Sequence, residues 1–151
     1  MSDLRELYQE VILDHSRNPR NFGRLENANH EADGHNPLCG DQITLYVSTT
    51  DGMVTDISFE GSGCAISTAS ASLMTEVLKG KSIEDAQAIF DQFHAMVTGD
   101  PAGESSSGQS MGKLSVLAGV REFPVRVKCA SLAWHTFKAA IEESEKPIST
   151  E

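Results

Sequence analysis

The chain has 151 residues, 39% of them hydrophobic, and no segment approaches the about 20 consecutive apolar residues that a membrane-spanning helix needs. Its 12 basic and 22 acidic residues give a formal net charge of −10, which repels phosphate backbones and anionic lipids, so we expect neither nucleic acid nor a membrane as a partner. The charge fits either a solubility device or a docking surface for a basic partner. Without an export signal at the N-terminus, we expect one cytoplasmic domain over residues 1–151 with a disordered tail over 143–151.

The first predicted element is an amphipathic helix over residues 3–16. Its apolar side chains recur with helical spacing, and Asn18-Pro19 ends it. Residues 20–37 are polar and rich in Asn, Gly and His, which predicts an irregular segment with at most one short edge strand.

Two runs with alternating apolar residues, 43–47 and 53–59, flank the turn signal Asp51-Gly52 and predict an antiparallel hairpin. In the second run the alternation places Met53, Thr55, Ile57 and Phe59 on one face. A glycine-rich turn ending at Cys64 follows, and then a helix that Lys79-Gly80 ends. Cys64 is therefore predicted at a strand-to-helix turn.

Helices dominate the rest of the chain. Ser82 is placed to cap one helix, residues 100–112 predict a mobile Ser/Gly-rich loop, and residues 113–118 predict a short helical piece. Pro124 is placed to begin the last helix. A helix, a hairpin and then a run of helices predict an α+β fold, with helices packed on one face of a small antiparallel β-sheet.

The chain has three cysteines, an odd number that argues against a disulfide framework and towards free thiols or metal ligands. Cys39 is predicted in a loop, Cys64 at a helix start, where the helix dipole favours a thiolate, and Cys129 on the inward stripe of the last helix. Zinc in a structural site takes four ligands. Asp41 lies two residues from Cys39, on the same side of an extended loop, and is the nearest carboxylate that completes the set.

The residues alone leave the metal site open. The cysteine spacing does not match the paired clusters of zinc ribbons and ferredoxins, and free cysteines also serve as small buried hydrophobes. His35 is either a rival fourth ligand or a solvated surface group. We assign no role to the remaining histidines, which are His15, His30, His94 and His135.

Several segments together carry a family resemblance: Leu7-Tyr8 through His15, Asn18 to Asn21, Asn36 to Asp41, Phe59 to Ser72, and Val125 to Trp134. The chain resembles the U-type iron-sulfur cluster assembly proteins (SufU, IscU and the N-terminal domain of NifU) from Leu4 to about Glu142. Cluster scaffolds of this family carry His before the third cysteine, whereas the SufU type carries Lys there and a longer preceding segment. Lys128 and the segment 99–112 therefore resemble the SufU type.

The resemblance implies a SufE/NifU-like fold, zinc bound by Cys39, Asp41, Cys64 and Cys129, and a SufS-type cysteine desulfurase as partner. It also implies that docking on the desulfurase replaces Cys39 on the zinc with a histidine of the partner. The freed Cys39 thiolate then acts as the catalytic residue, accepting persulfide sulfur and passing it to a downstream iron-sulfur scaffold. Such a chain is a sulfur carrier that activates a desulfurase rather than a stand-alone enzyme. Lys128 either steers the anionic sulfur or is a solvated side chain at a helix start.

Three functions are compatible with these residues. Zinc-dependent sulfur transfer is the one that Lys128 and the longer segment favour. A scaffold on which an iron-sulfur cluster is assembled and transferred uses the same ligands for a different cofactor. A zinc-stabilised interaction module keeps Cys64 and Cys129 but does not need an exchangeable Cys39. The bound metal and the fate of the sulfur distinguish the three.

Overall fold

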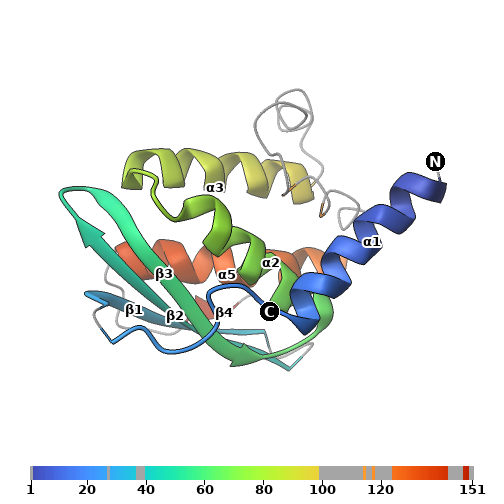
Figure 1. Ribbon diagram of the computed structural model, residues 1–151, viewed down its shortest axis with the longest axis horizontal. Helices are drawn as coiled ribbons and strands as arrows, with labels where there is room; N and C mark the ends of the chain where they lie inside the picture. The colour runs from blue at the N-terminus through green and yellow to red at the C-terminus, as the bar shows by residue number, and fades with distance from the viewer. Residues whose placement is uncertain are drawn as a thin grey trace.

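The computed structural model describes residues 2–26, 28–36, 40–98, 114, 117, 124–142 and 148–149. One layer is a β-sheet with strand order β3-β2-β1-β4, and the helices lie on one side of it (Figure 1). The elements in chain order are α1 (Ser2–Arg17), β1 (His30–Asn36), β2 (Asp41–Thr50), β3 (Met53–Ser62), α2 (Ala65–Leu78), α3 (Ile83–Thr98), α5 (Pro124–Ile141) and β4 (Ile148–Ser149). This arrangement confirms the predicted α+β class. Within these residues, no helix has the length and apolar content needed to span a membrane.

The predicted hairpin is confirmed, with β2 and β3 antiparallel on either side of Asp51-Gly52. The predicted face of β3 is wrong at its start, because Met53 and Thr55 are exposed while Val54 is fully buried. The pairing passes from Asp56 directly to Val54, so Thr55 is the extra residue of a β-bulge. A bulge shifts the alternation by one residue and thereby exchanges the faces of the strand.

The segment 20–37 contains one strand, as predicted, but β1 is seven residues long and pairs with β2 over its whole length. It is not a simple edge strand, because β4 pairs with it in parallel at Gly34 and His35. These two residues of β4 come from the tail over 143–151, for which we expect disorder. The strand β1 has few residues with high β propensity, so its pairing with β2 determines its conformation.

The last helix, α5, packs closely on the inner face of β1 and β2. Gly34 permits this approach, because a side chain at that position would collide with the Thr136 hydroxyl. Cys129 lies seven residues before Thr136, which places it on the same helical face. The close packing at Gly34 therefore holds Cys129 against the sheet.

The core is centred on Trp134 of α5, which is fully buried. Its ring stacks on Phe93 of α3 with 4.3 Å between the ring centroids, and its indole N–H donates a hydrogen bond of 3.1 Å to the Ser70 hydroxyl of α2. One side chain thus joins three helices. The predicted cap of α3 is confirmed, since the Ser82 hydroxyl accepts a hydrogen bond from the backbone N–H of Asp85.

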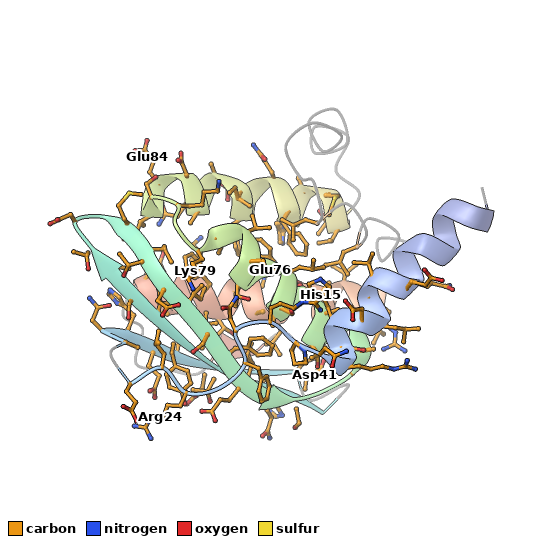
Figure 2. All side chains as sticks on the ribbon, viewed as in Figure 1. His15, Arg24, Asp41, Glu76, Lys79 and Glu84 are labelled. Atoms are coloured by element: carbon orange, nitrogen blue, oxygen red, sulfur yellow. The ribbon has the colours of Figure 1, made fainter. Side chains whose placement is uncertain are left out.

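His15, to which the sequence assigned no role, is buried between α1 and α2 (Figure 2). Its Nδ1 atom lies 2.7 Å from the Ser72 hydroxyl, which also accepts a hydrogen bond of 2.8 Å from the backbone N–H of Arg20. These contacts fix the end of α1 on α2. The loop predicted over 100–112 lies outside the described residues. Of the helical piece predicted over 113–118, only Leu114 and Leu117 are described, and both are fully buried.

Candidate metal centre

Five elements meet at one end of the sheet. There β1 ends at Asn36, β2 begins at Asp41, β3 ends at Ser62 and α2 begins after Cys64, while the first turns of α5 bring Cys129 beneath them. Figure 2 labels Asp41 at this end of the sheet. Residues distant in sequence are therefore brought together by the order of strands and helices.

Asp41 is the first residue of β2, and it is fully buried on the core face opposite Asn36. Its Oδ1 atom accepts a hydrogen bond of 2.8 Å from the backbone N–H of Cys64. The carboxylate can approach this backbone because residue 63 is glycine: a Cβ atom there would lie 2.5 Å from Oδ1. Burial of a carboxylate is costly unless donors or cations surround it, so its position indicates a specific use.

Cys64 is the N-cap residue of α2, as its predicted place at the strand-to-helix turn implied. Its Sγ atom accepts a hydrogen bond of 3.4 Å from the backbone N–H of Ser67, and it lies 3.9 Å from Asp41 Oδ2. The positive end of the helix dipole favours negative charge at this sulfur. Cys64 is only half-buried, and its neighbours Ser62 and Gly63 are exposed, so one side of the centre faces the surface.

Cys129 lies in the second turn of α5 and is fully buried, with its sulfur 3.6 Å from the side-chain nitrogen of Asn36. One ligand atom from each of Asp41, Cys64 and Cys129 lies within 4.8 Å of the other two. Two ligand atoms on a tetrahedral zinc ion lie about 3.6–3.8 Å apart for oxygen and sulfur ligands. The 3.9 Å between Cys64 Sγ and Asp41 Oδ2 is only slightly longer than that spacing. The three residues therefore fit a tetrahedral metal ion after a small contraction.

The structure brings together three of the four ligands expected from the sequence, and Cys39 lies outside the described residues. Lys128 is half-buried in the second turn of α5, directly before Cys129. His35 is exposed, one residue along β1 from Asn36, and strand alternation directs it to the opposite face of the sheet. It is not part of the cluster among the described residues.

Two contributors were not singled out from the sequence. Gly63 admits the Asp41 carboxylate, and Asn36 places its amide nitrogen within 3.4 Å of Asp41 Oδ2 and 3.6 Å of Cys129 Sγ. The sequence feature that could have pointed to them is their position beside two of the cysteines, since Asn36 stands three residues before Cys39 and Gly63 directly before Cys64. Their contacts arise only from packing, because Asn36 and Cys129 are 93 residues apart.

Comparisons with known proteins agree with one another. The family described as "NifU-like N terminal domain" matches residues 7–130. The chain is 43% identical over 144 residues to the iron-sulfur cluster assembly scaffold protein IscU of Streptococcus pyogenes serotype M1, covering 95% of this chain and 88% of that protein. It is 42% identical over 144 residues to the zinc-dependent sulfurtransferase SufU of Bacillus subtilis strain 168, covering 95% of each. The crystal structure of the N-terminal part of a nitrogen-fixing NifU-like protein from Brucella abortus has a TM-score of 0.78 at 25% identity, covering 95% of this chain and 99% of that one.

Proposed function

Because the chain belongs to the NifU-like N-terminal domain family, we propose that it serves iron-sulfur cluster assembly as a zinc-dependent sulfur-transfer protein. The observation that carries the proposal is the cluster of Asp41, Cys64 and Cys129, which combines two thiols and a carboxylate. Asp41 lies two residues along the chain from Cys39. The relative in Bacillus subtilis is named a zinc-dependent sulfurtransferase, which supports the same function here.

We assign the fourth ligand position to Cys39. Zinc in a closed site takes four ligands, and Asp41, Cys64 and Cys129 supply three. Bound zinc keeps its cysteine ligands deprotonated, so the site stores Cys39 as a thiolate. The buried Asp41 and Cys129 form the inner wall of the site, whereas Gly40, next to Cys39, is exposed. We therefore assign to Cys39, whose chain neighbour Gly40 is exposed, the exchangeable ligand position.

The transfer step needs a free Cys39 sulfur. Its thiolate attacks the outer sulfur of a persulfide on the donor cysteine of a desulfurase. A sulfur–sulfur bond forms on Cys39 while the one in the donor persulfide breaks, and the donor cysteine leaves as a thiolate. No oxidant or reductant is consumed, because one persulfide replaces another. Asp41, Cys64 and Cys129 stay in place throughout.

The proposed donor is a SufS-type cysteine desulfurase, and the proposed acceptor is a downstream cluster scaffold. Thiol chemistry of this kind requires a reducing compartment, so we place the activity in the cytoplasm. Lys128 precedes Cys129 at the start of α5, and we assign to its ammonium group the attraction of anionic sulfur at the site.

A cluster scaffold is the second candidate, which the name of the Streptococcus pyogenes relative favours. Thiolates bind iron as well as zinc, so the same donor set fits both functions. In this role an iron-sulfur cluster is the cargo, held by Cys39, Cys64 and Cys129 until it is handed to an acceptor protein.

Desulfurase turnover distinguishes the two functions. Zinc-loaded wild type is mixed with a SufS-type desulfurase, cysteine and a reductant, in parallel with Cys39→Ala and Asp41→Ala, and bound metal is measured in each. We expect wild type to accelerate sulfur release and Cys39→Ala to abolish the acceleration. Absence of acceleration by wild type, combined with formation of a coloured cluster from iron and sulfide on the chain, would replace sulfur transfer by the scaffold function.

A further inference from the structure

Asn36 is a fully buried amide at the inner wall of the metal centre. It is the last residue of β1 and pairs directly with Asp41 on β2, with both side chains on the core face of the sheet. Its Nδ2 atom lies 3.4 Å from Asp41 Oδ2 and 3.6 Å from Cys129 Sγ, the latter a normal length for a hydrogen bond to the larger sulfur atom. One side chain therefore contacts two candidate ligands from different elements.

The donor and acceptor pattern matches ligands in their charged forms. A side-chain amide nitrogen carries two N–H donors, whereas a carboxylate and a thiolate only accept. The opposite orientation of the Asn36 amide would place its oxygen against two anions, which is repulsive. In the present orientation Asn36 Oδ1 is buried and has no hydrogen-bond partner among the described residues. This orientation keeps both contacts between the amide nitrogen and the ligands, while the amide oxygen has no hydrogen-bond partner among the described residues.

Asn36 completes a set of N–H donors around the three ligands. Asp41 Oδ1 accepts from the backbone of Cys64, and Cys64 Sγ accepts from the backbone of Ser67. Asn36 supplies a donor to the second oxygen of Asp41 and one to the sulfur of Cys129. Hydrogen bonds behind metal ligands fix their orientation and stabilise their charge.

We propose that Asn36 is a positioning residue that keeps Asp41 and Cys129 in place when Cys39 leaves the metal. This inference rests on the proposed function, in which Cys39 must be exchangeable. With four ligands, the metal itself holds the site together. With three, the orientation of the remaining ligands depends more on their hydrogen bonds, so the contribution of Asn36 increases when Cys39 is absent.

The test is a cycle of variants measured by zinc competition with a chromophoric chelator. Asn36→Leu keeps the branched shape and removes both donors, and it is made with Cys39 intact and in the Cys39→Ala background. We expect zinc affinity to fall about tenfold with Cys39 intact and by a clearly larger factor, towards about a hundredfold, without it. An unchanged affinity, or the same factor in both backgrounds, would overturn the proposal. Gln42→Leu is the matched control, because Gln42 is exposed on the other face of the sheet beside Asp41.

A second variant and a second readout guard against loss of folding. If Asn36→Leu does not fold, Asn36→Ser is measured in its place. Serine retains one donor and adds no bulk, so we expect an intermediate loss of zinc affinity. Cobalt absorption bands report the geometry of thiolate ligation, and they should change in the Asn36 variants but not in Gln42→Leu. Unchanged bands in both Asn36 variants would count against the proposal. No desulfurase is used, so a failure of sulfur transfer with an intact zinc cycle refutes the proposed function and leaves the role of Asn36 standing.

Discussion

The backbone N–H of Cys64 donates a hydrogen bond of 2.8 Å to the carboxylate of Asp41, joining the first residue of β2 to the cap of α2. This bond explains how a hairpin followed directly by a helix brings together the residues of the candidate metal centre. The cap of α2 lies beside the start of β2, because β2 and β3 are antiparallel neighbours and α2 begins directly after the end of β3. The hydrogen bond thereby fixes Asp41 and Cys64 relative to one another.

Replacing Gly63 with alanine should displace the Asp41 carboxylate, because the new Cβ atom would lie 2.5 Å from Asp41 Oδ1. We expect zinc affinity to fall about tenfold to a hundredfold, the range typical when the support of a ligand is lost. Chelator competition measures the change. Ser62→Ala is the control, because it alters an exposed neighbour without adding an atom near the carboxylate. Equal affinities for the two variants would contradict the assigned role of Gly63.

Replacing Ser70 with alanine should destabilise the fold by about 1–3 kcal/mol, since it leaves the buried Trp134 N–H without its acceptor. Urea unfolding is the measurement. It can be followed by the fluorescence of Trp134, the one tryptophan of the chain. Ser62→Ala again provides a control, and a Ser70→Ala variant as stable as that control would show that the hydrogen bond adds nothing.

Acid should destabilise the protein partly through His135. Burial, and then the nearby His94 and Lys138, lower the pKa of His135 below its usual 6.5. The folded state therefore binds a proton less readily than the unfolded state, so this contribution to stability is present above pH 6.5 and is lost as the pH falls below it. The urea midpoint of unfolding should differ less between about pH 7.5 and about pH 5.5 in His135→Gln than it does in the wild type. An identical pH dependence in both proteins would refute this assignment.

The sequence predicted those parts of the fold that local signals determine. The Asp51-Gly52 turn and the Ser82 cap each act within a few residues, and both occur as expected. The bulge at Thr55 was missed, because its position depends on how β3 pairs with β2 and not on alternation within one strand. The length of β1 was underestimated for the same reason, since its polar residues form a strand only against β2.

The candidate site was predictable where a family motif marked it. The resemblance implied Asp41, Cys64 and Cys129 as ligands, and the spacing from Cys39 had also pointed to Asp41. All three lie in one cluster. Asn36 and Gly63 act on the site through contacts across the fold, which spacing along the chain does not reveal. Their roles followed only from distances between atoms.

The proposed role of Cys39 is tested most directly by following the transfer of a single sulfur atom from the desulfurase. A SufS-type desulfurase is loaded with one persulfide, separated from excess cysteine and mixed with the zinc-loaded protein, and free thiols are then trapped with an alkylating agent. Peptide mass spectrometry identifies the cysteine that carries the added sulfur. We expect the sulfur to appear on Cys39, with no transfer to Cys39→Ala. Sulfur on Cys64 or Cys129, or undiminished transfer to Cys39→Ala, would contradict it.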